Sequence, residues 1–189
     1  MNILTKDNYF IIKLTDDDIS KKIFVNRGSL VGTVNSGIKE YYKNEKGTPT
    51  QYKYSRLIFT ENFEDESTII VEGNNNNVIQ FPLESGHKYY VSSKTLLGMI
   101  GDVHILRKEK KFYNKNTQQD LFLIEGTGEL LLNSTNSKIL QFNMDNKENN
   151  FSTNKIMLFD ASLSYKIYKK TKNSSSISFN GEGIVYFGL

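Results

Sequence analysis

Hydrophobic positions along this chain fall in short runs with the length and composition of β-strands. The runs are rich in β-branched and aromatic residues and are separated by clusters of Gly, Asn, Asp and Ser, as is typical of strands joined by turns. The predicted strands are residues 10–14, 22–25, 68–71, 78–83, 88–91, 121–124, 129–132, 138–144, 162–168 and 183–187. This pattern favours an all-β sandwich over alternating strands and helices.

Two short segments depart from the simple strand pattern. Residues 15–20, with Thr15 as an N-cap before three aspartates, predict at most one helical turn. Pro82 lies inside a predicted strand and cannot donate a ladder hydrogen bond. That strand is therefore expected to lie at a sheet edge or to carry a bulge.

Comparison of the chain with itself indicates an internal repeat. Residues 78–83 (VIQFPL) resemble residues 139–144 (ILQFNM), 61 positions later, and residues 68–71 and 94–97 match 129–132 and 155–158 in the same register. At an offset of 66, residues 28–32 match 94–98, and Phe24-Val25 match Tyr90-Val91. We expect one domain, residues 1–189, built from three diverged β-repeats at about 10–73, 74–134 and 135–189.

The second and third repeats share a glycine pattern before their last strand. Gly126-Thr127-Gly128 and Gly181-Glu182-Gly183 each precede a β-run, which predicts a tight hairpin turn with positive φ. A phosphate-binding loop would need a helix N-terminus after the glycines, and here strands follow.

Composition and charge fit a globular protein and narrow its environment. The chain has 189 residues, of which 38% are hydrophobic and 24% charged, and its net charge is +3 from 24 basic and 21 acidic residues. This balance does not require a nucleic-acid or acidic-lipid partner. No run approaches the roughly 18 apolar residues of a membrane span, and the first residues lack signal-peptide order. We expect a cytoplasmic protein without a transmembrane segment.

The residue types that catalysis and metal binding require are scarce. Cysteine is absent, and His87 and His104 are the only histidines and form no ligand pair. The acidic runs, Asp16–Asp18 and Glu61, Glu64, Asp65 and Glu66, lack the alternation of a calcium loop. The serines have no nucleophile motif around them. We therefore assign no catalytic residue, metal ligand or cofactor, and a cupin-like enzyme is the least favoured function.

Basic residues interleaved with aromatics follow the same strand in the second and third repeats. Such patterns bind phosphate backbones or anionic surfaces, although they also suit a solvated strand face. The candidate anion-binding residues are Arg107, Lys108, Lys110, Lys111, Lys166, Lys169 and Lys170.

The repeated motifs resemble the AIM24 family, also called DUF124. The resemblance rests on residues 28–32 (GSLVG), on Gly86-x-x-Tyr89-x-Val91 followed by Leu96-Leu97, and on the two Gly-x-Gly endings, and it covers residues 10–189. It implies a β-sandwich related to the tryptophan RNA-binding attenuation protein and to double-stranded β-helices, with a tendency to form homo-oligomers. Mitochondrial members are linked to inner-membrane organisation. Here residues 43–48 are charged, where many members have a Gly-rich apolar loop.

The leading hypothesis is a non-enzymatic, oligomeric binding or scaffold protein of AIM24 type, with an unknown ligand. The second is a nucleic-acid or anionic-membrane binder that uses the repeated Lys/Tyr rim. A homo-oligomer is expected because short strands leave open sheet edges, and residues 183–187 and 9–12 are the candidate edges.

Overall fold

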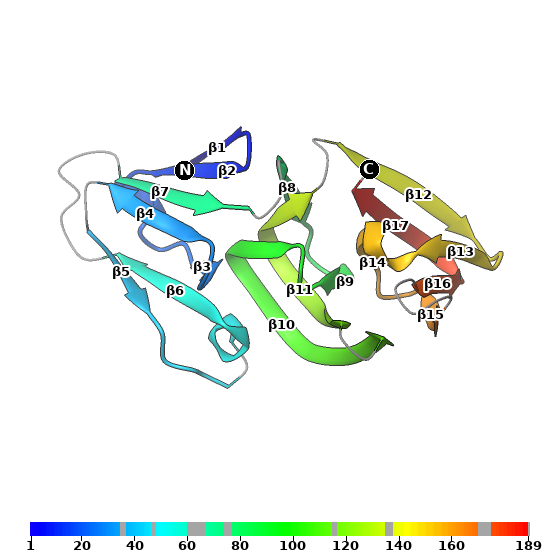
Figure 1. Cartoon of the computed structure of the whole chain (residues 1–189). Coiled ribbons are helices and arrows are strands. Elements are labelled where there is room, and N and C mark those ends of the chain that lie inside the picture. The colour runs from blue at the N-terminus through cyan, green and yellow to red at the C-terminus, as the bar shows by residue number, and fades with distance from the viewer. Residues whose placement is uncertain are drawn as a thin grey trace.

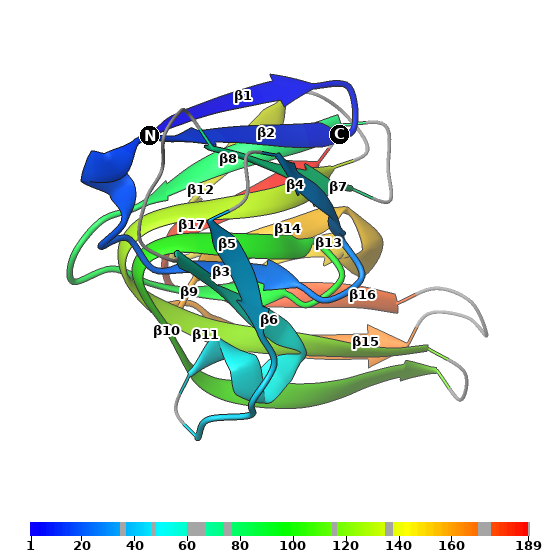
Figure 2. The same ribbon diagram turned by 90° about the vertical axis from the view of Figure 1, so that its left-hand side faces the viewer.

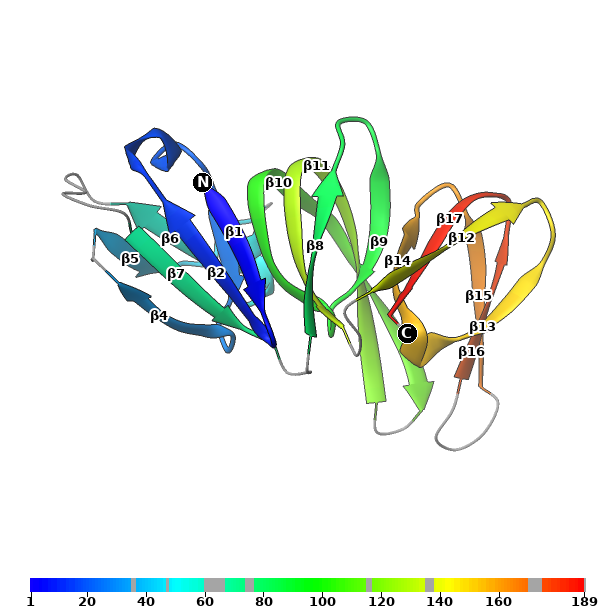
Figure 3. The same ribbon diagram turned by 90° about the horizontal axis from the view of Figure 1, so that it is seen from above.

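The computed structural model describes residues 1–34, 37–46, 48–59, 67–73, 77–114, 117–134, 138–169 and 175–188. Most of these residues lie in antiparallel strands, and the helical residues form only short 3₁₀ turns, which confirms the predicted all-β sandwich. Figures 1 and 3 show three units side by side in a row, with the N-terminal unit and the C-terminal unit at opposite ends.

The strands of the three units follow one another in chain order. The first unit contains β1 (Asn2–Lys6), β2 (Tyr9–Leu14), β3 (Ile23–Asn26), β4 (Leu30–Val34), β5 (Ile38–Tyr41), β6 (Tyr54–Phe59) and β7 (Ser67–Glu72). The second contains β8 (Asn77–Leu83), β9 (Lys88–Ser92) and two long strands, β10 (Leu96–Asn114) and β11 (Thr117–Ser134). The third contains β12 (Ile139–Asp145), β13 (Asn149–Ser152), β14 (Ile156–Asp160), β15 (Ser164–Lys169), β16 (Ser175–Asn180) and β17 (Glu182–Gly188).

Each unit is a sandwich of two layers, and each layer contains three strands with the same pairing. One layer is β2-β7-β4, β8-β11-β10 or β12-β17-β14, and the other is β3-β6-β5, β9-β11-β10 or β13-β16-β15. In the first unit β1 adds a fourth strand beside β2. The equivalent trios of cross-strand neighbours are Phe10–Val71–Leu30, Ile79–Leu132–Leu96 and Leu140–Phe187–Ile156. Residues 78–83 and 139–144, matched in the sequence, therefore occupy the same place in their units.

Neighbouring units share a sheet. β10 of the second unit pairs with β3 of the first unit, and β14 of the third unit pairs with β9 of the second unit. These two joints connect the layers into the long central sheet, which Figure 2 shows in a view along the row of units.

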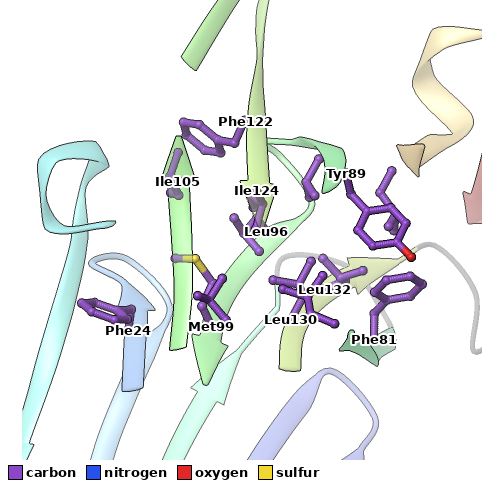
Figure 4. Close-up of a cluster of buried hydrophobic side chains, with 14 of the residues drawn as sticks. Phe24, Phe81, Tyr89, Leu96, Met99, Ile105, Phe122, Ile124, Leu130 and Leu132 are labelled. Carbon is purple, nitrogen blue, oxygen red and sulfur yellow. The ribbon is translucent and has the colours of Figure 1, made fainter. Parts of the chain in front are cut away.

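A hydrophobic core fills each unit and includes side chains from its neighbours. The middle core, drawn in Figure 4, contains Leu96, Met99 and Leu130 from the second unit, together with Phe24 from β3. Because each core uses residues from two units, the units support one another in the manner of a repeat protein.

The Gly-x-Gly segments have the predicted positive φ, but they are not hairpin turns. Gly126 and Gly128, with φ of 135° and 149°, lie inside the continuous strand β11, opposite residues 101–103 of β10. Here β10 and β11 pass together from one layer of the unit to the other. The glycines permit this bend because the backbones of the two strands approach too closely for a Cβ atom.

Other local predictions met mixed outcomes. A 3₁₀ turn forms at Asp16–Asp18, as predicted. The strand that contains Pro82, β8, lies at a sheet edge, as predicted, and pairs only with β11 among the described residues. The suggestion that residues 183–187 and 9–12 form open edges is wrong. β17 lies between β12 and β14, and β2 lies between β1 and β7.

Candidate binding surfaces

The structure brings part of the predicted basic rim together. Arg107 and Lys108 lie in β10, Lys166 lies in β15, and the Tyr165 hydroxyl of β15 donates a hydrogen bond to Glu109 of β10 at 2.5 Å. Lys110, Lys111 and Lys169 belong to the same two strands, but their side chains lie outside the described part of the chain, as does the whole of Lys170.

Carboxylates already accompany two of these cations. The Arg107 guanidinium lies 3.0 Å from Glu109 and donates a hydrogen bond to the Tyr90 hydroxyl, and the Lys108 ammonium lies 2.6 Å from Asp120. Burial raises the pKa of Tyr90, so this hydroxyl stays protonated. These contacts form a surface ion-pair network on β10 and β11, which Tyr165 of β15 joins through its hydrogen bond to Glu109, and they leave little positive charge for an anion.

Lys166 lines a polar hollow of about 180 Å³ on the outer face of β15 and β16. The hollow also contains Glu148, which accepts a hydrogen bond of 2.7 Å from Ser178. Because an acidic group shares this small hollow with the lysine, its charge does not single out an anionic ligand.

The acidic and histidine candidates have local partners. Asp18 is buried, and its carboxylate lies 2.5 Å from the N-terminal ammonium and 2.7 Å from the Lys21 ammonium. Burial alone would raise the pKa of Asp18, but these cations and the hydrogen bonds from Thr15 outweigh it and hold that pKa well below its usual range. Asp18 thus caps and anchors the N-terminal turn. The run Glu61–Glu66 lies outside the described residues.

Neither histidine has the neighbours of a metal site. His87 lies 3.6 Å from Glu84, and His104 lies 3.4 Å from Asp102, whose carboxylate also binds Lys22 at 2.7 Å. Among the described residues, no group of three or more His, Asp or Glu side chains is placed to hold a metal ion. Within the same part of the chain, no helix is long and apolar enough to cross a membrane.

We expect elemental analysis of the purified protein to find no stoichiometric transition metal. The chain offers two separated histidines and no thiolate, which are too few soft or borderline ligands for zinc, iron or manganese. Mass spectrometry after extensive dialysis is the measurement, with His87→Ala and His104→Ala as controls. One equivalent of metal that disappears in either variant would contradict the expectation.

The two ends of the row of units carry surfaces of a different kind. At the N-terminal end, β4 pairs with β7 on one side only within the described part of the chain, and a hollow of about 500 Å³ runs between β4 and β5. Val31 and Val34 of β4 are 55% and 52% exposed. An unpaired strand edge next to exposed valines is a surface suited to strand pairing.

The C-terminal end has a matching unpaired edge. β13 pairs with β16 on one side only among the described residues. Beside it, Leu140 and Phe142 of β12 are 46% and 38% exposed, and the Phe142 ring contacts the Phe151 ring of β13 at 5.3 Å. Large apolar side chains are therefore exposed next to a strand edge at this end as well.

Comparison with known proteins supports the fold but not a function. Searches against family models and against curated proteins find no match. The crystal structure of protein SPYM3_0169 from Streptococcus pyogenes is similar, with a TM-score of 0.73 at 14% sequence identity. The alignment covers 100% of this chain and 93% of that one. At this identity the likeness shows a shared fold alone.

Sequence reasoning did not find the two end surfaces. Leu140 and Phe142 are matched in the sequence by Ile79 and Phe81, which are partly or fully buried. The residue types are the same in both repeats, so only the position of the repeat in the row distinguishes a covered surface from an exposed one. No signal within the sequence of the third repeat marks the difference.

Proposed function

We propose that this protein is a non-enzymatic binding or scaffold protein of AIM24 type that acts as a homo-oligomer. The observation that supports the proposal is the pair of end surfaces. Each combines an unpaired strand edge, β4 or β13, with exposed apolar side chains. Exposed strand edges of this kind are templates for pairing with another chain. Self-association would cover both ends and extend the row of units.

The ion pairs of Arg107 and Lys108 favour this proposal over an anion-binding rim. A rim that binds nucleic acid or an anionic membrane needs uncompensated cations facing the ligand. Glu109 and Asp120 compensate the two cations whose side chains are described in β10.

The proposal predicts reversible self-association in solution. Sedimentation velocity over a wide concentration range should show species heavier than the 21.7 kDa chain, with a population that grows with concentration. Because apolar contacts and backbone hydrogen bonds would dominate, raising the salt concentration should not dissociate these species. A single 21.7 kDa species at all concentrations would contradict the proposed function.

A further inference from the structure

The joints between units inside the chain follow one rule. The first joint pairs β10 with β3, in the pairs Gly98–Val25, Met99–Phe24 and Ile100–Ile23. The second joint pairs β14 with β9, in the pairs Leu158–Val91, Phe159–Tyr90 and Asp160–Tyr89. One hydrogen bond recurs just beyond each ladder, from the Gly101 N–H to the Lys22 carbonyl at 2.8 Å and from the Ala161 N–H to the Lys88 carbonyl at 2.9 Å. The joint is therefore a repeated interface with a fixed register.

At each joint, side chains of the later unit enter the core of the unit before it. Leu97 and Ile100 of the second unit are buried in the core of the first unit, beside Ile12 and Val25. At the next joint, Met157 and Tyr186 of the third unit belong to the core of the second, where the Tyr186 ring contacts Phe81 at 5.0 Å. Leu97 and Met157 are the bulge residues of their strands, and the bulge directs them into the preceding unit.

Each end of the row carries one half of this interface. Val31 is the bulge residue of β4, in the position of Leu97 and Met157, and Val34 is in the position of Ile100 and Asp160. Among the described residues no further unit packs on this side of the first one, and both valines are more than half exposed. The N-terminal end thus has the inserting half of a joint with nothing to insert into.

The C-terminal end has the receiving half. Leu140 and Phe142 are in the positions of Phe10 and Ile12, which are 0% exposed. In the third unit these positions are 46% and 38% exposed, because among the described residues no further unit packs on them. The two ends therefore complement each other as the internal joints do, and continuity with those joints points to a second copy of this chain as the partner.

We infer that β4 of one copy pairs antiparallel with β13 of a second copy in the register of the internal joints. The inferred cross-strand pairs are Gly32 with Phe151, Thr33 with Asn150, and Val34 with Asn149. This inference rests on the proposed function and specifies its interface. Because the two surfaces differ, the contact is head-to-tail, and repetition closes a ring or extends a filament. β4 and β13 of one chain lie at opposite ends of the row, so a chain does not close on itself (Figures 1 and 3).

Cysteine cross-linking tests the register, since the chain has no cysteine of its own. The Gly101–Lys22 hydrogen bond makes the next pair, Ile100 with Ile23, a non-hydrogen-bonded pair, and Val34 with Asn149 is its equivalent. Cα atoms in such pairs lie about 4.5 Å apart, within the range of a disulfide. Val34→Cys and Asn149→Cys are to be purified separately, mixed, oxidised mildly and separated on a non-reducing gel.

The mixture should give two-chain disulfides at least about ten-fold faster than either variant alone. The matched control mixes Val34→Cys with Phe151→Cys, which lie two residues out of register, at a Cα separation of about 8 Å, beyond disulfide reach. Equal cross-linking by the control would overturn the register. Cross-linking of one variant with itself would indicate a twofold contact instead. An internal disulfide in a chain that carries both Val34→Cys and Asn149→Cys would indicate closure within one chain.

Sedimentation of the same samples separates this inference from the proposed function. If the cysteine-free protein self-associates but the Val34–Asn149 pair does not cross-link, the head-to-tail interface is wrong and the oligomeric scaffold stands. If the protein remains a monomer at all concentrations and no cross-link forms, both fail.

Discussion

Replacing Gly128 with alanine is expected to lower the free energy of unfolding by about 3 to 5 kcal/mol. Gly128 has φ of 149°, and a Cβ atom added there would lie 1.9 Å from the Ile100 carbonyl oxygen and 3.1 Å from the Gly101 Cα. The atoms in the way belong to the backbone of β10, so the clash is relieved only by separating β10 from β11. That separation would disturb the middle unit, on which both neighbours pack.

Two other glycines provide graded controls for this prediction. Gly183 is the equivalent position in β17, with φ of 157°, but a Cβ atom there meets only side chains, the nearest at 3.0 Å. Gly32 has nothing within 4 Å and no positive φ. Urea unfolding should rank the destabilisation as Gly128→Ala, then Gly183→Ala, then Gly32→Ala, with the last below about 1 kcal/mol. If Gly128→Ala costs no more than Gly32→Ala, the close approach of β10 and β11 is not a real constraint.

The glycine bend shows where sequence patterns stop being informative. Two glycines separated by one residue predicted positive φ, which is a local property and is confirmed at Gly126 and Gly128. The prediction of a tight turn was wrong because the reason for positive φ lies 24 to 28 residues away, in the backbone at Asp102 and Ile100. A turn and a shared bend of two paired strands need the same backbone angles, and only the pairing distinguishes them.

Strand existence was predictable where side chains alternate strongly and was missed where pairing decides. Residues 78–83 and 139–144 were predicted as strands from their apolar composition, and both are strands in equivalent places. By contrast, residues 149–152 were not among the predicted strands, yet they form β13 against β16. Asn and Ser have low strand propensity, but ladder bonds to a neighbouring strand outweigh propensity.

Edges were the least predictable feature, although they carry the proposed function. The sequence suggested residues 183–187 as an edge because the segment is apolar and uncharged, but β17 is apolar because two strands flank it. The edge strands of the two end surfaces, β4 and β13, have residues of mixed polarity. Whether a strand is central or at an edge depends on the whole pairing order, which no single segment encodes.

Replacing Val31 with aspartate is expected to weaken self-association by at least about 100-fold, or about 3 kcal/mol, with little change in the stability of the chain. In the head-to-tail contact, Val31 takes the place of Leu97 and Met157, which are both 2% exposed in the core of the preceding unit. A carboxylate there would be desolvated without a partner. In the isolated chain Val31 is 55% exposed, so the free energy of unfolding should change by less than about 1 kcal/mol.

Leu106→Asp is the matched control, because Leu106 is 43% exposed on β10 and belongs to neither end surface. It should change the net charge equally and leave association intact, which would show that charge alone does not dissociate the assembly. A sharper test uses residues 34 and 149, which face each other in the inferred register. Position 34 accepts a carboxylate, because Asp160 has this place at the second internal joint. Copies carrying Val34→Asp should associate with copies carrying Asn149→Arg more tightly than with unaltered copies, because the new carboxylate and guanidinium form a charge-assisted pair. Sedimentation velocity of the separate and mixed proteins measures both effects. If Val31→Asp associates as strongly as the unaltered protein, β4 is not the inserting half of the contact.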